Sequence, residues 1–361
     1  MFGGSAGAVR RNADDAWLIS LISAKGCAET NIEQRYCTGE KVVILYKSNR
    51  VHGLIGRSMT LVLSVCLCAF AQRAPEKAAP ADATPILWQE PSDIATRNLL
   101  LGPGGEVMQP DLSSVTLIEK QKGGHSIKYR VRDAQGRVWV AKIGKEAQSE
   151  VAASRLLWAV GYFTDITYLA PRVEIQGKGT FENVRFEARP EEIKRLEEWT
   201  WEQNPFSGTP EFQGLKVMML LLGNWDIKDN NNRILLVQDE QTGNKQLRYI
   251  VSDLGSTFGK TSGLFIGTRS EPRDYLKAKF VVGVKGDRVE FNYGGKRGGL
   301  FHDITVAQAG WIGDRLARLS ERQIRDAFRA ANYREGEVSL LTKAVQARIN
   351  ELVALNRTVA K

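Results

Sequence analysis

The chain has 361 residues, of which 25% are charged and 43% hydrophobic, ordinary values for a soluble globular protein with a sizeable core and two or three domains. Its net charge of +9 suits an anionic partner, but no basic block with interleaved aromatics marks a nucleic-acid site. All four cysteines lie before residue 70 and there are three histidines, which argues against a disulfide scaffold, a cysteine zinc site or a histidine-rich metal site in the long remainder.

The amino-terminal stretch predicts export. Residues 1–58 show no sustained helical or strand periodicity, and we treat them as an upstream segment of uncertain nature. Met59 then opens the apolar run MTLVLSVCLCAFAQ, which follows arginines and ends in small residues at the positions that a signal peptidase reads. We interpret residues 59–71 as a signal peptide cleaved after Ala71, the alternative being a short buried helix or a membrane anchor. The expected location is secreted or periplasmic, with no stable membrane span in the mature chain.

A linker is predicted to separate this segment from the folded part. Residues 72–95 open with QRAPEKAAPADATP, whose Ala, Pro and Lys content cannot form a core. The folded part is therefore expected to begin near residue 96.

Three strands joined by two turns are predicted next, over VTLIEKQ, SIKYRVRD and RVWVAKIG. Gly123 and Gly124 lie in the first turn, and a plain hairpin turn explains both residues. The third strand ends in V-A-K, so that Lys142 stands at a strand end. The segment EAQSEVAASRLLWAVGY then has the apolar spacing of a helix, ended by Gly161.

The following segments predict a hairpin and two helices. PRVEIQGKGTFENVRFEARP indicates a hairpin. RPEEIKRLEEWTWEQNPF and PEFQGLKVMMLLLGNWD indicate helices, the first opened by Pro190 with acids in its first turn.

The stretch from Leu221 to Lys260 carries the most specific signal. Asp226, Lys228 and Asn231 stand as D-x-K-x-x-N, and ILLVQ and RYIVS predict a hairpin whose open end brings Asn231 close to Asp253. A carboxylate and an amide oxygen suit a hard cation such as Mg²⁺. Taken alone, KDNNN is equally typical of a solvated loop.

The order of these motifs resembles the protein-kinase-like superfamily over residues 115–260. DLGSTFG is more similar to the atypical branches, namely the secretory-pathway casein-kinase-type, phosphoinositide-kinase and HipA-like kinases, and we expect a bacterial member. Asn224 and Trp225 replace the His-Arg of the kinase H-R-D, and no A-P-E follows. Activation-loop control of the eukaryotic type is therefore not expected.

The resemblance implies an α+β, two-lobed protein-kinase-like fold. An antiparallel β-rich amino-terminal lobe would span residues 96–189 and a mainly α-helical carboxy-terminal lobe residues 190–361. ATP and Mg²⁺ would bind between the lobes, and a phosphoryl group would pass to a hydroxyl of an unidentified protein, lipid or small molecule. The sequence does not indicate the oligomeric state.

The resemblance also implies the roles of the site residues. Asp226 would be the catalytic base with Lys228 beside it, and Asn231 and Asp253 would hold the metal.

Lys142 would bind the phosphates of the nucleotide, together with the turn at Gly123 and Gly124. Glu150 is the expected ion-pair partner of Lys142, and Glu146 is the second choice. The alternative is that Lys142 is an exposed lysine at the end of a surface strand.

After Lys260, KFVVGV and RVEFNY predict a hairpin in the place where kinases bind the acceptor. Lys277, Lys279, Lys296 and Arg297 would meet an anionic acceptor there, although a solvated face is the commoner meaning of such charges. The tail predicts helices.

Two tail signals are specific. Ser320 and Gln323 suit a capping box, and an apolar stripe is more typical of core than of a partner-binding face: Leu341, Val345, Ile349 and Leu352.

Two other functions stay open. One is a pseudokinase, a secreted binding module without transfer; retention of Lys142, Asp226, Asn231 and Asp253 together argues against it. The other is an unrelated α+β protein in which KDNNN binds calcium, although the EF-hand spacing is absent.

Overall fold

The chain divides into two units, Met1–Phe70 and Ala71–Lys361. The computed structural model describes residues 8–10, 16–22, 34–38, 41–47 and 79–359, apart from 123–125, 240–241 and 262–266. The predicted signal peptide, residues 59–71, lies outside the described residues, and so do Gly123 and Gly124.

The first unit contains an antiparallel sheet that the sequence analysis did not expect. Its strands β1 (Ala8–Arg10), β2 (Ala16–Ile22), β3 (Gln34–Thr38) and β4 (Lys41–Lys47) pair in the order β1-β2-β4-β3. The two longest strands, AWLISLI and KVVILYK, are rich in aliphatic and aromatic residues, which favour strands. Neither shows the strict alternation of polar and apolar residues that announces a strand, which is why periodicity did not find them.

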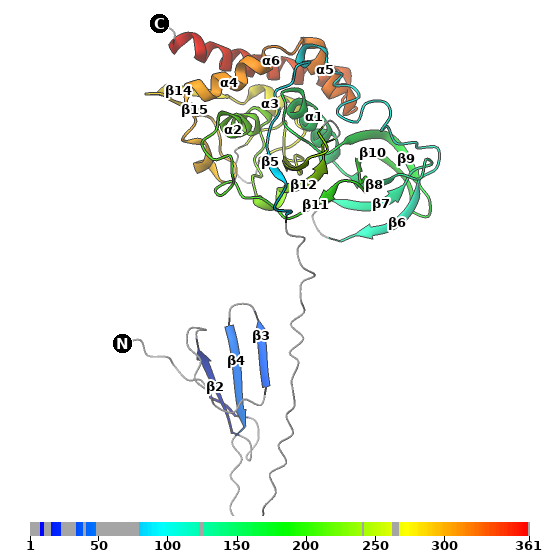
Figure 1. Ribbon diagram of the computed structural model, residues 1–361, viewed down its shortest axis with the longest axis vertical. Coiled ribbons are helices and arrows are strands. Elements are labelled where there is room, and N and C mark those ends of the chain that lie inside the picture. Colours follow the sequence, from blue (N-terminus) through cyan, green and yellow to red (C-terminus); the bar gives the residue numbers. More distant parts are fainter. Residues whose placement is uncertain are drawn as a thin grey trace, which may run out of the picture. The chain divides into compact units, whose positions relative to one another are not determined.

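The second unit begins its amino-terminal lobe with a five-stranded antiparallel sheet, ordered β6-β7-β8-β10-β9 (Figure 1). The strands are β6 (Thr116–Gln121), β7 (Ile127–Arg132), β8 (Val138–Ile143), β9 (Thr167–Ile175) and β10 (Gly179–Ala188). The three strands predicted around V-A-K and the hairpin predicted after them are confirmed.

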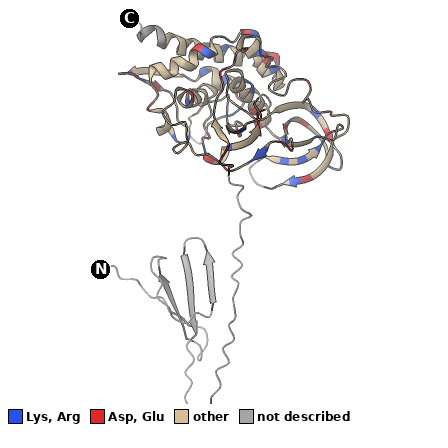
Figure 2. Cartoon of the chain, in the orientation of Figure 1, with Lys and Arg blue, Asp and Glu red and all other residues tan. Residues whose placement is uncertain are grey.

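The two faces of this sheet differ in chemistry because side chains alternate along each strand. One face carries an apolar core of its own, in which Val131 and Trp139 are fully buried. The intervening positions on β7, β8 and β10 carry Lys128, Lys142 and Arg185, and Figure 2 shows basic residues along these strands. The charged face is the one that borders the candidate site.

Helix α1 (Glu146–Ala159) follows β8, as predicted, and packs against β9, β10 and α5. Its buried side chains, among them Val151 and Leu156, join the core of the carboxy-terminal lobe rather than the apolar core of the sheet. The chain leaves the helix at Gly161, whose φ of 102° lies in a region that other residues rarely adopt.

The helix predicted over RPEEIKRLEEWTWEQNPF is wrong. The structure has turns and a short strand, β11 (Lys194–Arg195), which pairs with β12. Trp199 and Trp201 are buried, with ring centroids 4.9 Å apart, and Trp199 also contacts Phe212. Burial of these large aromatic rings outweighs the helix propensity of the acidic and basic residues between them.

Helix α2 (Pro210–Leu222) and the hairpin of β12 (Asn232–Gln238) and β13 (Lys245–Val251) confirm the predictions for this region. The helix begins after Thr209, whose hydroxyl accepts from the Phe212 amide, and ends at Gly223 in the left-handed region. In the hairpin Asn232 lies opposite Val251, so the residues just outside this pair meet at its open end.

Residues 84–95 belong to the fold, so the linker predicted over residues 72–95 reached too far. Strand β5 (Thr84–Ile86) pairs in parallel with β13 and adds an edge to the sheet β11-β12-β13-β5. Leu87 is 2% exposed, and Ile94, in the 3₁₀ helix η1 (Ile94–Thr96), is 0% exposed. A three-residue strand leaves no periodic pattern, so composition alone decided the prediction.

The remaining elements build the helical lobe (Figure 1). They are η2 (Asp229–Asn231), α3 (Pro272–Lys277), β14 (Val281–Lys285), β15 (Arg288–Phe291), η3 (Gly298–Phe301), α4 (Val306–Leu316), α5 (Glu321–Ala330) and α6 (Glu335–Val359). The β14–β15 hairpin and the Ser320–Gln323 capping box are confirmed, whereas α3 and α4 were not predicted. The apolar stripe of α6 is buried, as expected of core.

The α+β fold with two lobes that was expected from the sequence is confirmed. An antiparallel β-rich lobe precedes a mainly helical lobe, and α1 lies between them (Figure 1). Within the described part of the chain, no helix has the length and apolarity needed to cross a membrane.

The burial of Leu87 and Ile94 predicts that the segment before residue 96 stabilises the second unit. Leu87→Ala and Ile94→Ala are each expected to lower the free energy of unfolding by about 2–4 kcal/mol, because each leaves a cavity in a packed core. Leu100→Ala, at a position that is 47% exposed, is the control and should change it by about 0.5 kcal/mol or less. Urea denaturation measures the free energy of unfolding of all three variants. Three equal small changes would show that residues 84–95 are part of the linker and not of the fold.

Candidate active site

A cavity of about 430 Å³ lies between the lobes. The sheet, helix α1, the hinge after β10 and the open end of the β12–β13 hairpin all contribute to its walls. Its lining residues are Gln121, Lys128, Val140, Lys142, Glu150, Arg185, Glu187, Arg189, Arg195, Leu196, Asn230, Asn231, Arg233, Ser252 and Asp253. Four of the predicted site residues, from four separate segments, therefore border one cavity.

Lys142 is buried at the centre of an ion-pair network. Its Nζ lies 2.6 Å from Glu150 Oε1, 2.8 Å from Glu146 Oε2 and 3.6 Å from Asp253 Oδ1. Its side chain is 2% exposed, so the alternative of an exposed strand-end lysine is wrong. The structure brings Lys142 together with both of its candidate partners and with the acid of the D-L-G motif.

Glu150 is shared between two cations. Its other oxygen, Oε2, lies 2.8 Å from Arg185 Nη1, and Arg185 also pairs with Glu187. Burial raises the pKa of Glu150 to about 7, while Arg185 and Lys142 act in the opposite direction. Helix α1 brings the Glu150 carboxylate to the sheet. The buried charge of Lys142 is therefore stabilised only when α1 is in this position.

The β12–β13 hairpin places Asn231 beside Asp253, as predicted. The amides of Ser252 and Asp253 donate to the Asn231 carbonyl at 2.7 and 3.1 Å. Burial raises the pKa of Asp253, but Lys142, Glu150 and the Gly255 amide outweigh it and lower the value to about 2. The Asn231 amide nitrogen donates to the Asp226 carbonyl at 2.7 Å, which leaves the amide oxygen as the atom able to bind a cation.

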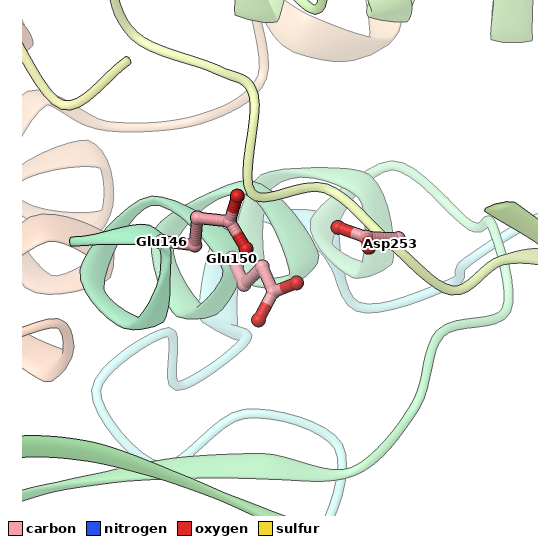
Figure 3. Close-up of side chains that lie close together, drawn as sticks. All are labelled: Glu146, Glu150 and Asp253. Carbon is pink, nitrogen blue, oxygen red and sulfur yellow. The ribbon is translucent and has the colours of Figure 1, made fainter. Parts of the chain in front are cut away.

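The carboxylates nearest to Lys142 are not all equally suited to a metal. Glu146, Glu150 and Asp253 each offer an oxygen within 4.8 Å of the others, and Figure 3 shows the first two on α1 and the third on the segment after β13. Glu146 pairs with Lys142 and Arg269, and Glu150 with Lys142 and Arg185. Asp253 is ionised and 43% exposed, so Asp253 with the Asn231 oxygen fits Mg²⁺, which takes few protein ligands and keeps phosphate and water.

Asp226 is flanked by two lysines. Lys228 Nζ lies 2.7 Å from its Oδ2 and Lys296 Nζ lies 2.5 Å from its Oδ1. The hydrogen bond from Lys228 to Asp226 raises the pKa of Lys228. Sequence analysis paired Lys228 with Asp226 but did not place Lys296 there, since 70 residues separate the two.

The segment 293–297 crosses the loop that carries Asp226. The Lys296 amide donates to the Trp225 carbonyl at 2.8 Å, and the Tyr293 hydroxyl donates to the Asn224 carbonyl at 3.0 Å. Arg297 makes two hydrogen bonds to Asp229, at 2.7 and 2.6 Å. The region predicted to meet the acceptor therefore touches the loop of the expected catalytic base, while Arg297 is committed to an ion pair.

Two polar side chains of KDNNN, those of Asp229 and Asn232, make hydrogen bonds to neighbouring segments. Asp229 accepts from Arg297 and from the Trp201 amide, and Asn232 is buried and donates to the Trp199 carbonyl at 2.9 Å. These contacts do not favour the calcium-binding alternative, because calcium takes oxygen ligands and both Asp229 oxygens already accept from Arg297.

Several charged residues of the cavity were not predicted from the sequence, among them Lys128, Arg185 and Arg195. Arg195 pairs with Asp165 and donates to Ser252 at 2.7 Å, which ties the hinge to the hairpin. A signal was present in the sequence, since SIKYRVR and VRFEAR alternate charged with apolar residues and so predict a charged sheet face. Glu187 and Arg189, at the end of the hairpin predicted over PRVEIQGKGTFENVRFEARP, also line the cavity.

Comparisons with known proteins find distant likenesses to kinases. No family model matches the chain, and no curated protein matches it. Among solved structures, the proinflammatory kinase CtkA of Helicobacter pylori is similar with a TM-score of 0.44 and 11% identity, over 68% of this chain and 96% of that one. The Rio2 kinase of Chaetomium thermophilum, solved as an ADP/Mg²⁺-phosphoaspartate complex, is similar with a TM-score of 0.28 and 13% identity, over 66% and 72%.

The burial of Lys142 predicts a cost in stability when its charge is removed. Lys142→Met is expected to lower the free energy of unfolding by about 3 kcal/mol, because Glu150 and Glu146 lose a buried partner. Combined with Glu150→Gln, the loss should be less than additive, since both changes act on one ion pair.

Lys145→Met, at an exposed position three residues along, is the matched control and should cost about 0.5 kcal/mol or less. Chemical denaturation of the four variants measures these values. A Lys142→Met protein as stable as Lys145→Met would contradict the buried network.

Proposed function

We propose that the protein is an ATP- and Mg²⁺-dependent phosphotransferase of the protein-kinase-like type. The observation that carries the proposal is the contact of Lys142 with Glu150 and Asp253, which joins a strand, a helix and the D-L-G segment at one cavity. Phosphoryl transfer requires a cation on the phosphates, ligands for Mg²⁺ and a carboxylate that orients the attacking hydroxyl. The cavity and the adjoining loop of Asp226 hold a candidate residue for each of these three requirements.

In this proposal the residues of the chain act mainly by position and charge. Lys142, held by Glu150, would bind the phosphates, and Asp253 with the Asn231 oxygen would hold Mg²⁺, which neutralises phosphate charge when bound. Asp226 would orient the acceptor hydroxyl and accept its proton. Lys228, 2.7 Å from Asp226, would stabilise the negative charge that develops on the transferred group.

The segment after Asp253 supports a place among the atypical branches of the superfamily. Trp225, which stands where H-R-D has Arg, donates its indole N–H to the Thr268 carbonyl at 3.1 Å, and Arg269 stacks over its ring at 5.1 Å. A Cβ on Gly267 would lie 2.5 Å from this ring, so the contact is close. We infer that an aromatic side chain, and not a phosphorylated residue, holds this segment in place.

A pseudokinase is the second candidate, and one observation favours it. Both carboxylate oxygens of Asp226 are ion-paired with lysines, which leaves the acceptor hydroxyl to displace one of them. Binding without transfer would produce nucleotide-dependent stabilisation but no turnover, so the same variants separate the two functions.

Metal-dependent nucleotide binding is expected to depend on Asp253 more than on Asp226. At a hundredfold excess over its Kd, MgATP should stabilise the wild type by about 2.7 kcal/mol, and Asp253→Ala should abolish this gain. Asp226→Ala should keep most of the gain while lowering ATP turnover by more than about a hundredfold. Asp287→Ala, an exposed turn residue, is the control for both measurements.

Thermal melts with and without MgATP and an assay of ATP hydrolysis provide the two readouts. Equal stabilisation of wild type and Asp253→Ala would overturn the metal assignment. Stabilisation without turnover in the wild type would favour the pseudokinase.

We also propose that the protein is secreted or periplasmic, on the basis of the signal-like run from Met59. Mass spectrometry of the exported protein should find an amino terminus at or near Gln72, because cleavage is expected after Ala71. Recovery of residues 1–58 on a cytoplasmic protein would contradict export.

A further inference from the structure

The register of the sheet places three basic side chains in one row on the wall of the cavity. Lys128 on β7 pairs directly with Lys142 on β8, and Lys142 pairs directly with Arg185 on β10. Residues paired in this way have Cβ atoms about 5 Å apart and point to the same face. Like charges at such positions destabilise a sheet, so the row needs compensation.

Among the described residues, acidic side chains pair with two of these three cations but not with the third. Lys142 and Arg185 share Glu150, and each has a further acid of its own. Lys128 has no ion pair among these residues, although it is half-buried and lines the cavity. Burial and the neighbouring Lys142 lower the pKa of Lys128, as expected for a cation that lacks a partner.

The other end of the cavity is also lined by basic residues. Arg189, Arg195 and Arg233 line the side near the hinge, and the apolar lining residues are Val140 and Leu196. Of the charged lining residues, six are basic and three are acidic. Acids outside the lining pair with three of the basic residues, namely Lys142, Arg195 and Arg233, but none in the described part of the chain pairs with Lys128. Ligand pockets that select a flat heterocycle usually enclose it in apolar and aromatic side chains with a few polar groups. This cavity has the opposite balance.

We propose that the cavity recognises its co-substrate through the phosphate chain rather than through the base, with Lys128 as a second phosphate-binding cation beside Lys142. The inference rests on the proposed function and extends its co-substrate from ATP to nucleoside triphosphates as a class. A triphosphate supplies the anionic oxygens that the row of cations lacks. A base near the hinge meets charged side chains and, among the described lining residues, two apolar ones, Val140 and Leu196, which offer little basis for selecting one heterocycle over another.

Competition binding with the full chain tests the proposal. ATP, GTP and CTP, each with Mg²⁺, are expected to bind within about threefold of one another, since a difference below 1 kcal/mol is less than one good hydrogen bond. Inorganic tripolyphosphate should displace them, and adenosine should not.

Lys128→Gln should weaken the three nucleotides and tripolyphosphate alike, by about tenfold or more, the value of a charge-assisted hydrogen bond. Lys128→Arg should restore most of the affinity. Lys120→Gln removes the same charge from the neighbouring strand β6, where the side chain is exposed and outside the cavity, and should leave affinity unchanged.

The outcomes separate this inference from the function on which it rests. Selection of ATP over GTP and CTP by more than about thirtyfold, with displacement by adenosine, would overturn phosphate-directed recognition and leave the proposed function standing. Wild-type affinity in Lys128→Gln would overturn the role of Lys128. Failure of the folded wild type to bind any triphosphate or tripolyphosphate would overturn both.

Discussion

The buried charge of Lys142 is the constraint on which the rest of the site depends. A lysine that is 2% exposed loses several kcal/mol of hydration, which acids in contact must offset. Here the acids come from outside its own sheet, since Glu146 and Glu150 belong to α1 and Asp253 follows β13. The ionised lysine is therefore compatible only with a fold in which helix and hairpin are both in place.

The same network joins two separate apolar cores. Lys142 extends from a sheet whose far face has a core of its own, whereas α1 buries Val151 and Leu156 in the core of the helical lobe. Packing of α1 against α5 fixes the helix on that lobe. The Lys142–Glu150 ion pair thus connects the lobes through charge, and Arg195, which reaches both Asp165 and Ser252, provides a second polar connection at the hinge.

The loop of Asp226 is positioned by a different kind of contact. Trp225 is buried between the segment after Asp253 and the chain from Tyr293 to Arg297, and it contributes both its indole N–H and its carbonyl to hydrogen bonds. Its aromatic ring, a large rigid surface at low conformational cost, holds the segment from Gly267 to Arg269, while its backbone carbonyl holds the chain at Lys296. Lys296, which this arrangement brings to Asp226, adds a second positive charge beside that carboxylate, where Lys228 already lies.

Sequence patterns that extend over a few residues determined several helices and strands by themselves. The strands around V-A-K, the helix ended by Gly161, the β12–β13 hairpin and the capping box at Ser320 follow from alternation, helical spacing, turn residues and caps, all of which act over a few residues. Because the hairpin closes on itself, the proximity of Asn231 and Asp253 was also predictable.

Tertiary structure overrode these patterns where burial was stronger. Trp199 and Trp201 replaced a predicted helix with turns, and β5 became an edge strand only because β13 was there to pair with it. The row of Lys128, Lys142 and Arg185 and the contact of Lys296 with Asp226 depend on strand register and on chain crossings between distant segments. No local pattern encodes such contacts, because their energy arises only when the segments meet.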